Sequence, residues 1–357
     1  MVFGNTATIT AASTSEASTS KDLALPADAS DTISSVRWSP VRNHLAAGSW
    51  DGKMRIYDIA TDGSARGLTM LSADGPVFSC DWSKDGSFVA AGGADKKLHI
   101  LDVATGQTMT IGSHDAPVRA VRFVDVLSAS PIIATGSWDK TVRYWDMRMS
   151  NPHIFTLDCA DRVYCMDSAS KLLVIGTAEQ HIHLVDLAQP TKFLRTTESP
   201  LKHQTTAVAA FPDGKGWATA GIEGRCGING VEEVKNRVNN INFTFRCHRD
   251  APDPQKVVKI WTVRDVNFHP VHTTTFTTAG ADGTFHFWDR VAHQRLRGFS
   301  PVGGAITATS FNRDGTIFAY AVGYEWSQGY AKNRPDYPIK LMLHPVDEAE
   351  VQPKVRR

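Results

Sequence analysis

Short apolar stretches separated by polar turns repeat along this chain, and apolar and polar positions alternate inside each stretch. Alternation with a period of two is typical of strands that bury one face. Four such strands form a unit that ends on an aromatic or aliphatic residue followed by aspartate. The closing aspartates of the first four units, Asp58, Asp102, Asp146 and Asp186, are 44, 44 and 40 residues apart. The pattern predicts an array of four-stranded sheets.

Seven of these units fill most of the chain. They are predicted at residues 33–58, 77–102, 118–146, 162–186, 206–247, 263–289 and 305–345. A repeat of about 40–45 residues that closes on Trp-Asp, as at 145–146 and 288–289, indicates a WD-repeat β-propeller. We therefore expect an all-β, seven-bladed ring. Leu23 and Leu25 are expected to point inward from an N-terminal strand that completes the last blade.

The segments outside the predicted ring are short. Residues 1–20 are rich in Ser, Thr and Ala and are predicted to be disordered, residues 21–346 form the propeller, and residues 347–357 form a charged tail. The final KVRR is either an import signal or a solvated tail.

Bulk composition excludes several classes of protein. Lys plus Arg number 38 against 37 Asp plus Glu, so any nucleic-acid contact must come from a local patch. No apolar run approaches the roughly 20 residues of a membrane span, and membrane insertion is not expected. The five cysteines form no CxxC pair, which favours small buried side chains over a disulfide or zinc framework.

No motif for catalysis or cofactor binding occurs in a suitable context. The histidines His181, His183, His269, His272 and His286 are interpreted as strand and turn residues rather than metal ligands. Aspartates in the tight turns between second and third strands are interpreted as structural, with His114 as the one histidine clearly placed to bond such an aspartate. We expect a protein that is not an enzyme and uses no cofactor or metal.

Two tryptophans depart from an average repeat. Trp50 and Trp138 precede the turn aspartates Asp51 and Asp139 in GSWDGK and GSWDK, at a position that is normally small or variable. In a loop at the top of a propeller, an indole can anchor a partner peptide, because Trp is enriched at binding hot spots. The alternative is that each indole packs over its neighbouring blade and stabilises the ring.

Basic and aromatic residues alternate on the predicted blades 5 and 6. Such a group can bind single-stranded nucleic acid through stacking and phosphate contacts, and it equally suits an acidic peptide. The alternative is a solvated flank with its aromatic residues turned inward. The candidate residues are Arg225, Phe243, Phe245, Arg246, Trp288, Arg290 and Arg295.

Several segments are more specific than generic blades. TGSWDKTVRYWDMR, TTESPLKHQ, IEGRCGI, NFTFRCHR, VNFHPVH, GTFHFWDR and EWSQGY followed by NRPDYP together resemble the RAE-one/GLE-two family of messenger-RNA export factors, in particular its fungal members. The resemblance runs from about Ser30 to Pro345.

The resemblance implies an adaptor at the nuclear pore, located in the nucleus and nuclear envelope and also in the cytoplasm. Members of the family bind the GLEBS hairpin of an FG nucleoporin across the top of the ring and assist export of polyadenylated RNA. A monomeric ring, with messenger RNA or other single-stranded nucleic acid as a further partner, is expected. Carried onto this chain, the nucleoporin-binding candidates are Trp50, Asp51, Trp138, Asp139, Tyr324, Glu325 and Trp326.

One rival comes from a different class. Trp145-Asp146-Met147-Arg148 matches the WDxR pattern of WD-repeat substrate receptors of cullin ubiquitin ligases, in which an exposed Arg pairs with carboxylates of an adaptor.

Overall fold

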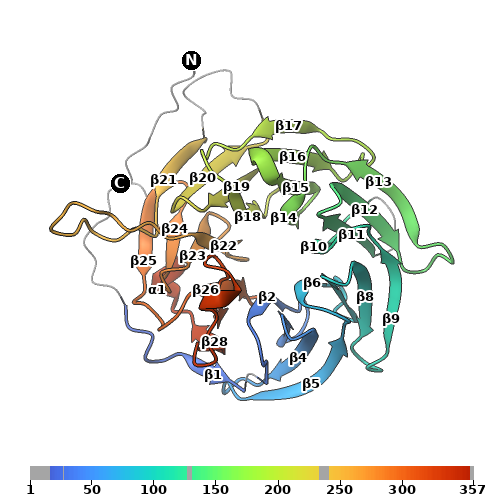
Figure 1. Ribbon diagram of the computed structural model, residues 1–357, viewed down its shortest axis with the longest axis horizontal. Coiled ribbons are helices and arrows are strands. Elements are labelled where there is room, and N and C mark those ends of the chain that lie inside the picture. Colours follow the sequence, from blue (N-terminus) through green and yellow to red (C-terminus); the bar gives the residue numbers. More distant parts are fainter. Residues whose placement is uncertain (1–16, 27, 127–130, 233–240, 354–357) are drawn as a thin grey trace.

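The computed structural model describes residues 17–26, 28–126, 131–232 and 241–353 of the 357-residue chain. Their strands form seven antiparallel sheets of four strands each, arranged around a central channel as blades of a propeller (Figure 1). This confirms the predicted all-β, seven-bladed fold. Of residues 1–20, which were predicted to be disordered, 1–16 lie outside the described part of the chain, as do the terminal 354–357. Ala17 is buried and forms a parallel bridge with Phe299, so the prediction does not hold at that residue.

Each blade begins at the channel and ends at the rim. Blades 1 to 3 comprise β2 (Ile33–Trp38), β3 (His44–Ser49), β4 (Lys53–Ile59) and β5 (Ala65–Ser72); β6 (Val77–Trp82), β7 (Phe88–Gly93), β8 (Lys97–Asp102) and β9 (Thr108–Ser113); and β10 (Val118–Val124), β11 (Ile132–Ser137), β12 (Thr141–Asp146) and β13 (His153–Asp158). Blades 4 and 5 comprise β14 (Val163–Ala169), β15 (Leu172–Thr177), β16 (His181–Asp186) and β17 (Arg195–Glu198); and β18 (Thr205–Ala210), β19 (Gly216–Gly221), β20 (Arg225–Gly230) and β21 (Phe243–Arg246).

Blade 6 comprises β22 (Val263–Phe268), β23 (Thr275–Gly280), β24 (Phe285–Asp289) and β25 (Gln294–Gly298). Blade 7 takes β26 (Ile306–Phe311), β27 (Ile317–Val322) and β28 (Lys340–Pro345) from the end of the chain and its outer strand β1 (Leu23–Leu25) from the beginning. The described helical segments are short: η1 (Ala178–Gln180), η3 (Tyr330–Lys332) and α1 (Glu348–Val351).

The N-terminal strand closes the ring as predicted. Leu23, Ala24 and Leu25 pair with Leu343, Met342 and Leu341. Leu25 is buried, as predicted, but Leu23 is 41% exposed. Residues two apart on a strand share one face, so both leucines lie on the same face and only the part of it around Leu25 is covered. Asp22 strengthens the closure because its carboxylate accepts bonds from Tyr320 at 2.6 Å and His344 at 2.7 Å.

The C-terminal segment is more ordered than a solvated tail. Residues 348–351 form a helical turn with a capping box at Asp347, and Val351 is 1% exposed. Thr275 of blade 6 donates to the Val351 carbonyl at 2.7 Å. The predicted charged tail at 347–357 therefore begins with a segment that packs onto the ring.

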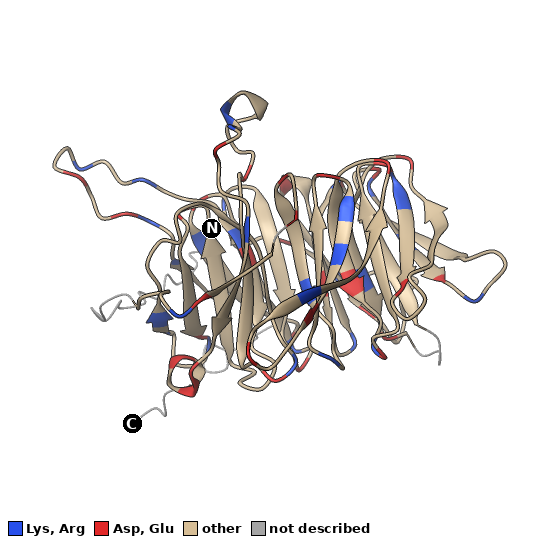
Figure 2. Cartoon of the chain, turned by 90° about the horizontal axis from the view of Figure 1, so that it is seen from below, with Lys and Arg blue, Asp and Glu red and all other residues tan. Residues whose placement is uncertain are grey.

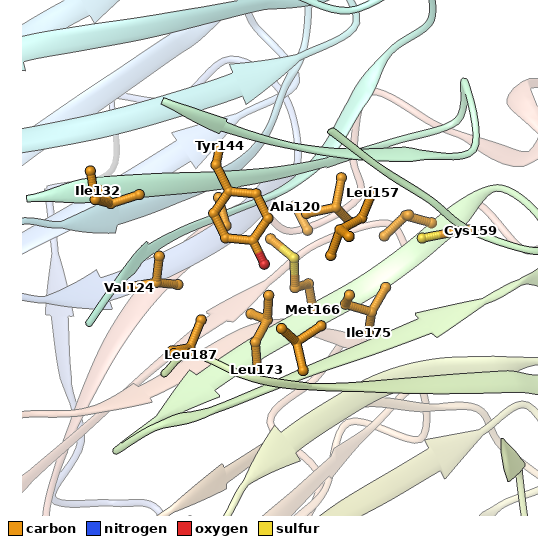
Figure 3. Packing of buried hydrophobic residues seen from close by; sticks show 14 residues of the cluster. Ala120, Val124, Ile132, Tyr144, Leu157, Cys159, Met166, Leu173, Ile175 and Leu187 are labelled. Carbon is orange, nitrogen blue, oxygen red and sulfur yellow. The ribbon is translucent and has the colours of Figure 1, made fainter. Parts of the chain in front are cut away.

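Apolar side chains fill the space between adjacent blades. Figure 3 shows one such cluster, in which Tyr144, Ile132 and Leu157 of blade 3 lie against Met166, Leu173 and Ile175 of blade 4. All six side chains are at most 6% exposed. Burial of this kind on both faces of each sheet is the main stabilising interaction of the ring.

Two blades add a polar network to this packing. In blade 3, Trp145 Nε1 donates to Thr135 at 2.7 Å, and His114 bridges Thr135 and Asp139 at 2.7 and 2.8 Å. His248, Thr278, Asp282 and Trp288 repeat the arrangement in blade 6, with 2.9 Å between Trp288 Nε1 and Thr278. The sequence identified His114 but missed His248.

The turns that link second and third strands have the geometry that their sequences predict. Gly52, Lys96 and Lys140 each follow the turn aspartate and have φ of 79°, 69° and 69°. Glycine adopts this left-handed region without strain, whereas lysine does so at a cost. These turns define what we call the top face of the ring.

Candidate functional site: the top face and the channel mouth

Four aromatic rings join blades 7, 1, 2 and 3 across the top face. Trp326 stacks on Trp50 with ring centroids 4.5 Å apart and an angle of 13°, Trp50 contacts Phe78 at 5.4 Å, and Phe78 contacts Trp138 at 5.8 Å. Tyr324 extends the series beyond Trp326 at 5.4 Å. We call these five residues the aromatic arc.

The arc is accessible from solvent. Trp138 is 37% exposed, and Trp50 and Trp326 are half-buried. The indoles are therefore partly open to solvent, but Trp50 and Trp138 also contact rings of neighbouring blades, which is the packing role that the sequence left open as the alternative. Trp326 also has a φ of 64°, a strained value for a bulky residue, and its buried Nε1 has no hydrogen-bond partner in the described structure. Strain of this kind often occurs at ligand clamps.

The two turn aspartates have a different role. Asp51 pairs with Arg55 at 2.8 Å and accepts a bond from Ser30 N, and Asp139 is held by His114 and Thr141. Burial alone would raise the pKa of each carboxyl, but these hydrogen bonds hold both pKa values below the ordinary one. Both groups are engaged inside the ring, so they orient the turns that carry Trp50 and Trp138.

Glu325 lies between the arc and the channel. Its carboxylate accepts a bond from Ser327 N at 3.2 Å, and its side chain lines the mouth of the channel together with Tyr324 and Trp326. The hydroxyl of Tyr324 donates to the Gly329 carbonyl at 2.7 Å, which ties the loop between β27 and β28 to the arc.

The arc borders a cavity of about 590 Å³ that we call the channel mouth. Its lining includes all five residues of the arc and, from the first strands of blades 3 to 6, Arg119, Tyr164, Thr206 and Arg264. Sequence reasoning missed Phe78, Arg119 and Arg264. Aligning the seven units on the first apolar residue of each would have placed all three at one position.

Oppositely charged side chains lie close together along the channel, and Arg37, Arg122 and Asp265 line the same cavity as the arc. Arg122 Nε lies 3.0 Å and Arg37 Nη2 lies 3.8 Å from Asp167 Oδ1. Asp81, Asp167 and Asp265 also accept backbone N–H bonds from the next blade, at Phe123, Ala210 and Thr309. We call these five charged residues the channel waist, and their charges are satisfied internally.

The structure separates the residues predicted to form one flank on blades 5 and 6. Phe243, Phe245 and Trp288 are at most 6% exposed and belong to the core between the two blades, so their rings present no face to a base. Arg290 stacks on Phe211 at 4.3 Å and lies 3.7 Å from Asp213. It too is used by the fold.

The flank arginines also lie at opposite ends of their strands. Arg225 begins β20, next to the turn at 222–224 on the top face, and Arg246 ends β21 directly opposite it in register. Arg295 pairs with Trp288 near the other end of blade 6. Figure 2 shows that blue and red segments are interspersed around the ring. A single basic surface spanning Arg225, Arg246, Arg290 and Arg295 is therefore not formed.

Of the five candidate histidines, His183, His269 and His286 are buried, and His181 and His272 are half-buried. His183 donates to or accepts from Thr196 at 2.8 Å, and burial together with the charge of His181 lowers its pKa to about 4. His269 bonds the Gly315 carbonyl at 3.1 Å. Among the residues that the structure describes, no group of three or more His, Cys, Asp or Glu side chains is placed to hold a metal ion. No helix in this part of the chain is both long and apolar enough to span a membrane.

Arg148 of the WDxR pattern is 60% exposed, and its guanidinium lies 3.2 Å from Asp146 of its own blade. The charge of Arg148 is therefore already paired with Asp146, and it is not held ready for a carboxylate of an adaptor protein.

Comparison with known proteins gives a consistent result. The model of the WD domain, G-beta repeat, matches residues 23–58, 68–102, 106–146 and 254–289. The chain is 46% identical over 336 residues to the WD40 repeat protein poxJ of Penicillium oxalicum, covering 94% of this chain and 96% of that protein. It is 46% identical over 362 residues to the mRNA export factor GLE2 of Chaetomium thermophilum, covering 100% and 99%.

The Poly(A)+ RNA export protein of Schizosaccharomyces pombe is 44% identical over 356 residues, which covers 100% of this chain and 99% of that protein. Identity at this level over full length, together with the seven-bladed ring, establishes the relationship. The chain belongs to the RAE-one/GLE-two family of WD-repeat mRNA export factors.

Proposed function

We propose that this protein is a nuclear-pore adaptor for export of polyadenylated mRNA that binds the GLEBS segment of an FG nucleoporin on the aromatic arc. The single observation that carries the proposal is the continuous series of rings from Trp326 through Trp50 and Phe78 to Trp138, in which the three indoles are partly exposed and Phe78 is buried between them. Arcs of this kind supply large apolar contact area from rigid side chains, as interface hot spots do.

The mechanism needs no chemistry. A flexible nucleoporin segment orders on a rigid surface, inserts apolar side chains beside the indoles and adds main-chain hydrogen bonds. The buried, unpartnered Nε1 of Trp326 gives such a segment a donor to satisfy if Trp326 turns toward it. The ring itself is expected to move little because its blades are packed on both faces.

The proposal is tested by calorimetric titration of a nucleoporin fragment that contains a GLEBS motif into the full-length chain. The double substitution Trp50→Ala/Trp138→Ala should weaken binding strongly while the ring stays folded. The matched control is Met70→Ala/Met109→Ala, which removes two exposed apolar side chains from the rim strands β5 and β9. Unchanged affinity in the folded tryptophan variant would contradict binding on the arc.

RNA contact is a second proposal, supported by the top of blade 5. Arg225 and Arg246 stand opposite each other across β20 and β21, and like charges in that position destabilise a sheet. Burial and the charges of Arg246 and Arg225 also lower the pKa of Arg249. A polyanion such as RNA would relieve this repulsion, and a steep loss of affinity with salt is the measurement that tests it.

A further inference from the structure

The innermost strand of each blade carries one extra residue at the same place. In every blade the register with the second strand skips one position: Ser34, Phe78, Arg119, Tyr164, Thr206, Arg264 and Thr307 are the residues passed over. All seven line the channel mouth. The bulges therefore re-aim a ring of seven side chains, as β-bulges often do beside binding sites.

Three members of this ring bond the neighbouring blade. The hydroxyl groups of Ser34, Thr206 and Thr307 donate to the carbonyls of Val77, Val263 and Ile33 respectively. These residues act as clamps between blades, and the last of them links blade 7 to blade 1. Four members, Phe78, Arg119, Tyr164 and Arg264, are larger and serve no such purpose.

Arg119 and Arg264 are the unusual members. Neither guanidinium makes a hydrogen bond or an ion pair with any residue of the described structure, and Arg264 Nε is buried without a partner. Burial lowers the pKa of both groups, and the positive charge of Arg264 lowers that of Arg119 further, while the carboxylate of Glu325 acts in the opposite direction on Arg264 and that of Asp265 on both, without forming an ion pair. Both nonetheless remain protonated at neutral pH because the ordinary value is so high.

The arginines of the channel waist differ from Arg119 and Arg264 in that they form ion pairs. There, each arginine has a carboxylate within reach, with Arg122 and Arg37 both beside Asp167. Arg119 and Arg264 are half-buried, and charged groups that are shielded from water are usually paired. A fold that pairs the arginines of the waist but leaves two at the mouth unpaired has placed positive charge where an external anion can reach it.

We propose that the channel mouth holds one oxyanion group, a phosphate or a carboxylate, between Arg119 and Arg264. The two arginines project from blades 3 and 6, on opposite sides of the opening, where β10 and β22 face each other (Figure 1). Guanidinium groups bind phosphate and carboxylate through paired, charge-assisted hydrogen bonds. Tyr164, which also lines the mouth, offers a hydroxyl as an additional donor.

The oxyanion has two possible sources. One is a free phosphate-bearing small molecule, for which the cavity of about 590 Å³ has room. The other is an acidic side chain of the nucleoporin segment on the aromatic arc, and this source rests on the proposed function. Both sources would use the same two arginines. The experiment therefore distinguishes them by the ligand that is added, and the same arginine variant serves in both arms.

The first arm titrates inorganic pyrophosphate into the full-length chain and follows heat and the fluorescence of the mouth tryptophans. Arg119→Gln/Arg264→Gln should weaken binding about tenfold or more, because each arginine contributes charge-assisted bonds. The control Arg66→Gln/Arg313→Gln removes the same charge from two exposed positions outside the mouth and should bind normally. Equal weakening in both variants would indicate an effect of net charge and would overturn a site for free phosphate.

The second arm uses a GLEBS-containing fragment in which each acidic residue is replaced in turn by its amide. One replacement should weaken binding to the wild-type chain but not to Arg119→Gln/Arg264→Gln. If the unaltered fragment fails to bind the wild-type chain, the proposed function fails while the pyrophosphate arm still stands. If pyrophosphate binding and fragment coupling are both independent of the two arginines, the oxyanion site is wrong.

Stability supplies a further readout. Because the two guanidinium groups repel each other and lack partners, Arg119→Gln/Arg264→Gln should leave the melting temperature of the unliganded chain equal or higher. A purely structural role would lower it, and a clear decrease would count against the proposal.

Discussion

The aromatic arc and the aromatic residues of blades 5 and 6 look alike in the sequence but differ in the structure. Both sets contain tryptophans close to charged residues. Trp288 donates its indole N–H to Thr278 inside its own blade and is 5% exposed, whereas Trp138 is 37% exposed and lies beside Phe78 at the channel mouth. A tryptophan whose polar atom is already bonded within the blade serves the fold, and one at a top turn remains available for a partner.

The largest effect that tests this comparison is on folding. Trp288→Ala should lower the free energy of unfolding by about 3–5 kcal/mol, because it removes a buried ring and leaves Thr278 and His248 with a broken network. Chemical denaturation monitored by circular dichroism measures the loss. Nucleoporin affinity of the folded protein should not change, and a loss of affinity without a loss of stability would place Trp288 in the binding surface.

Trp138→Ala should show the opposite behaviour. Nucleoporin affinity should fall by about 1–3 kcal/mol, roughly 5- to 150-fold in Kd, because Trp138 ends the exposed arc. The matched control is Trp145→Ala in the same blade, where the ring is 4% exposed and the cost should appear in stability. Calorimetry measures the affinity of both variants, and chemical denaturation measures their stability. A loss of stability in Trp138→Ala together with a loss of affinity in Trp145→Ala would contradict the assignment of Trp138 to binding and Trp145 to the fold.

A smaller effect depends on pH. Burial alone would raise the pKa of Asp282, but hydrogen bonds from His248 and Thr284 hold it below the ordinary value. A depressed pKa gives stability that is present above the unfolded value of about 3.9 and is lost as pH falls through the folded value. Asp282→Asn should lower the free energy of unfolding by about 1–2 kcal/mol at pH 7. At pH 3 the difference in unfolding free energy between the variant and the wild type should be smaller. If that difference is the same at both pH values, the Asp282 carboxylate does not contribute to the pH dependence of stability.

The smallest effect concerns the exposed Arg246. Arg246→Ala should change stability by less than about 0.5 kcal/mol and should reduce the slope of log affinity for single-stranded RNA against log salt by about 1. The control Arg66→Ala removes an exposed charge from the rim of blade 1 and should leave the slope unchanged. If the slope of log affinity against log salt is the same in both variants, Arg246 of blade 5 does not contact RNA.

Strand periodicity was sufficient for the architecture because its repeat is long and strongly patterned. Even the degenerate blade 5 has its outer strand at Phe243–Arg246, inside the predicted 242–247. His248 was missed because it stands before a long connection rather than at the usual distance from its turn. Phe245 was placed on a binding flank but is buried between blades 5 and 6. Alternation separates the two faces of a strand, but it does not show which face the neighbouring blade covers.

The mouth residues were missed for a different reason. Phe78, Arg119 and Arg264 occupy bulges, and a bulge shifts the alternation by one so that the pattern misassigns the side chain. The predicted Asp51 and Asp139 lie where expected, but their hydrogen-bond partners Arg55 and His114 come from positions that a turn motif does not specify.

Closure of blade 7 by β1 has a consequence for biosynthesis. Leu23 leaves the ribosome long before its partner Leu343, so the outermost hydrogen bonds of that blade cannot form until the strand that carries Leu343 has been synthesised. Six blades must wait as an open crescent with an unpaired edge, which is when such chains are most prone to associate wrongly. Protein synthesised without residues 17–26 should therefore lose yield through aggregation before any loss of nucleoporin binding is measurable.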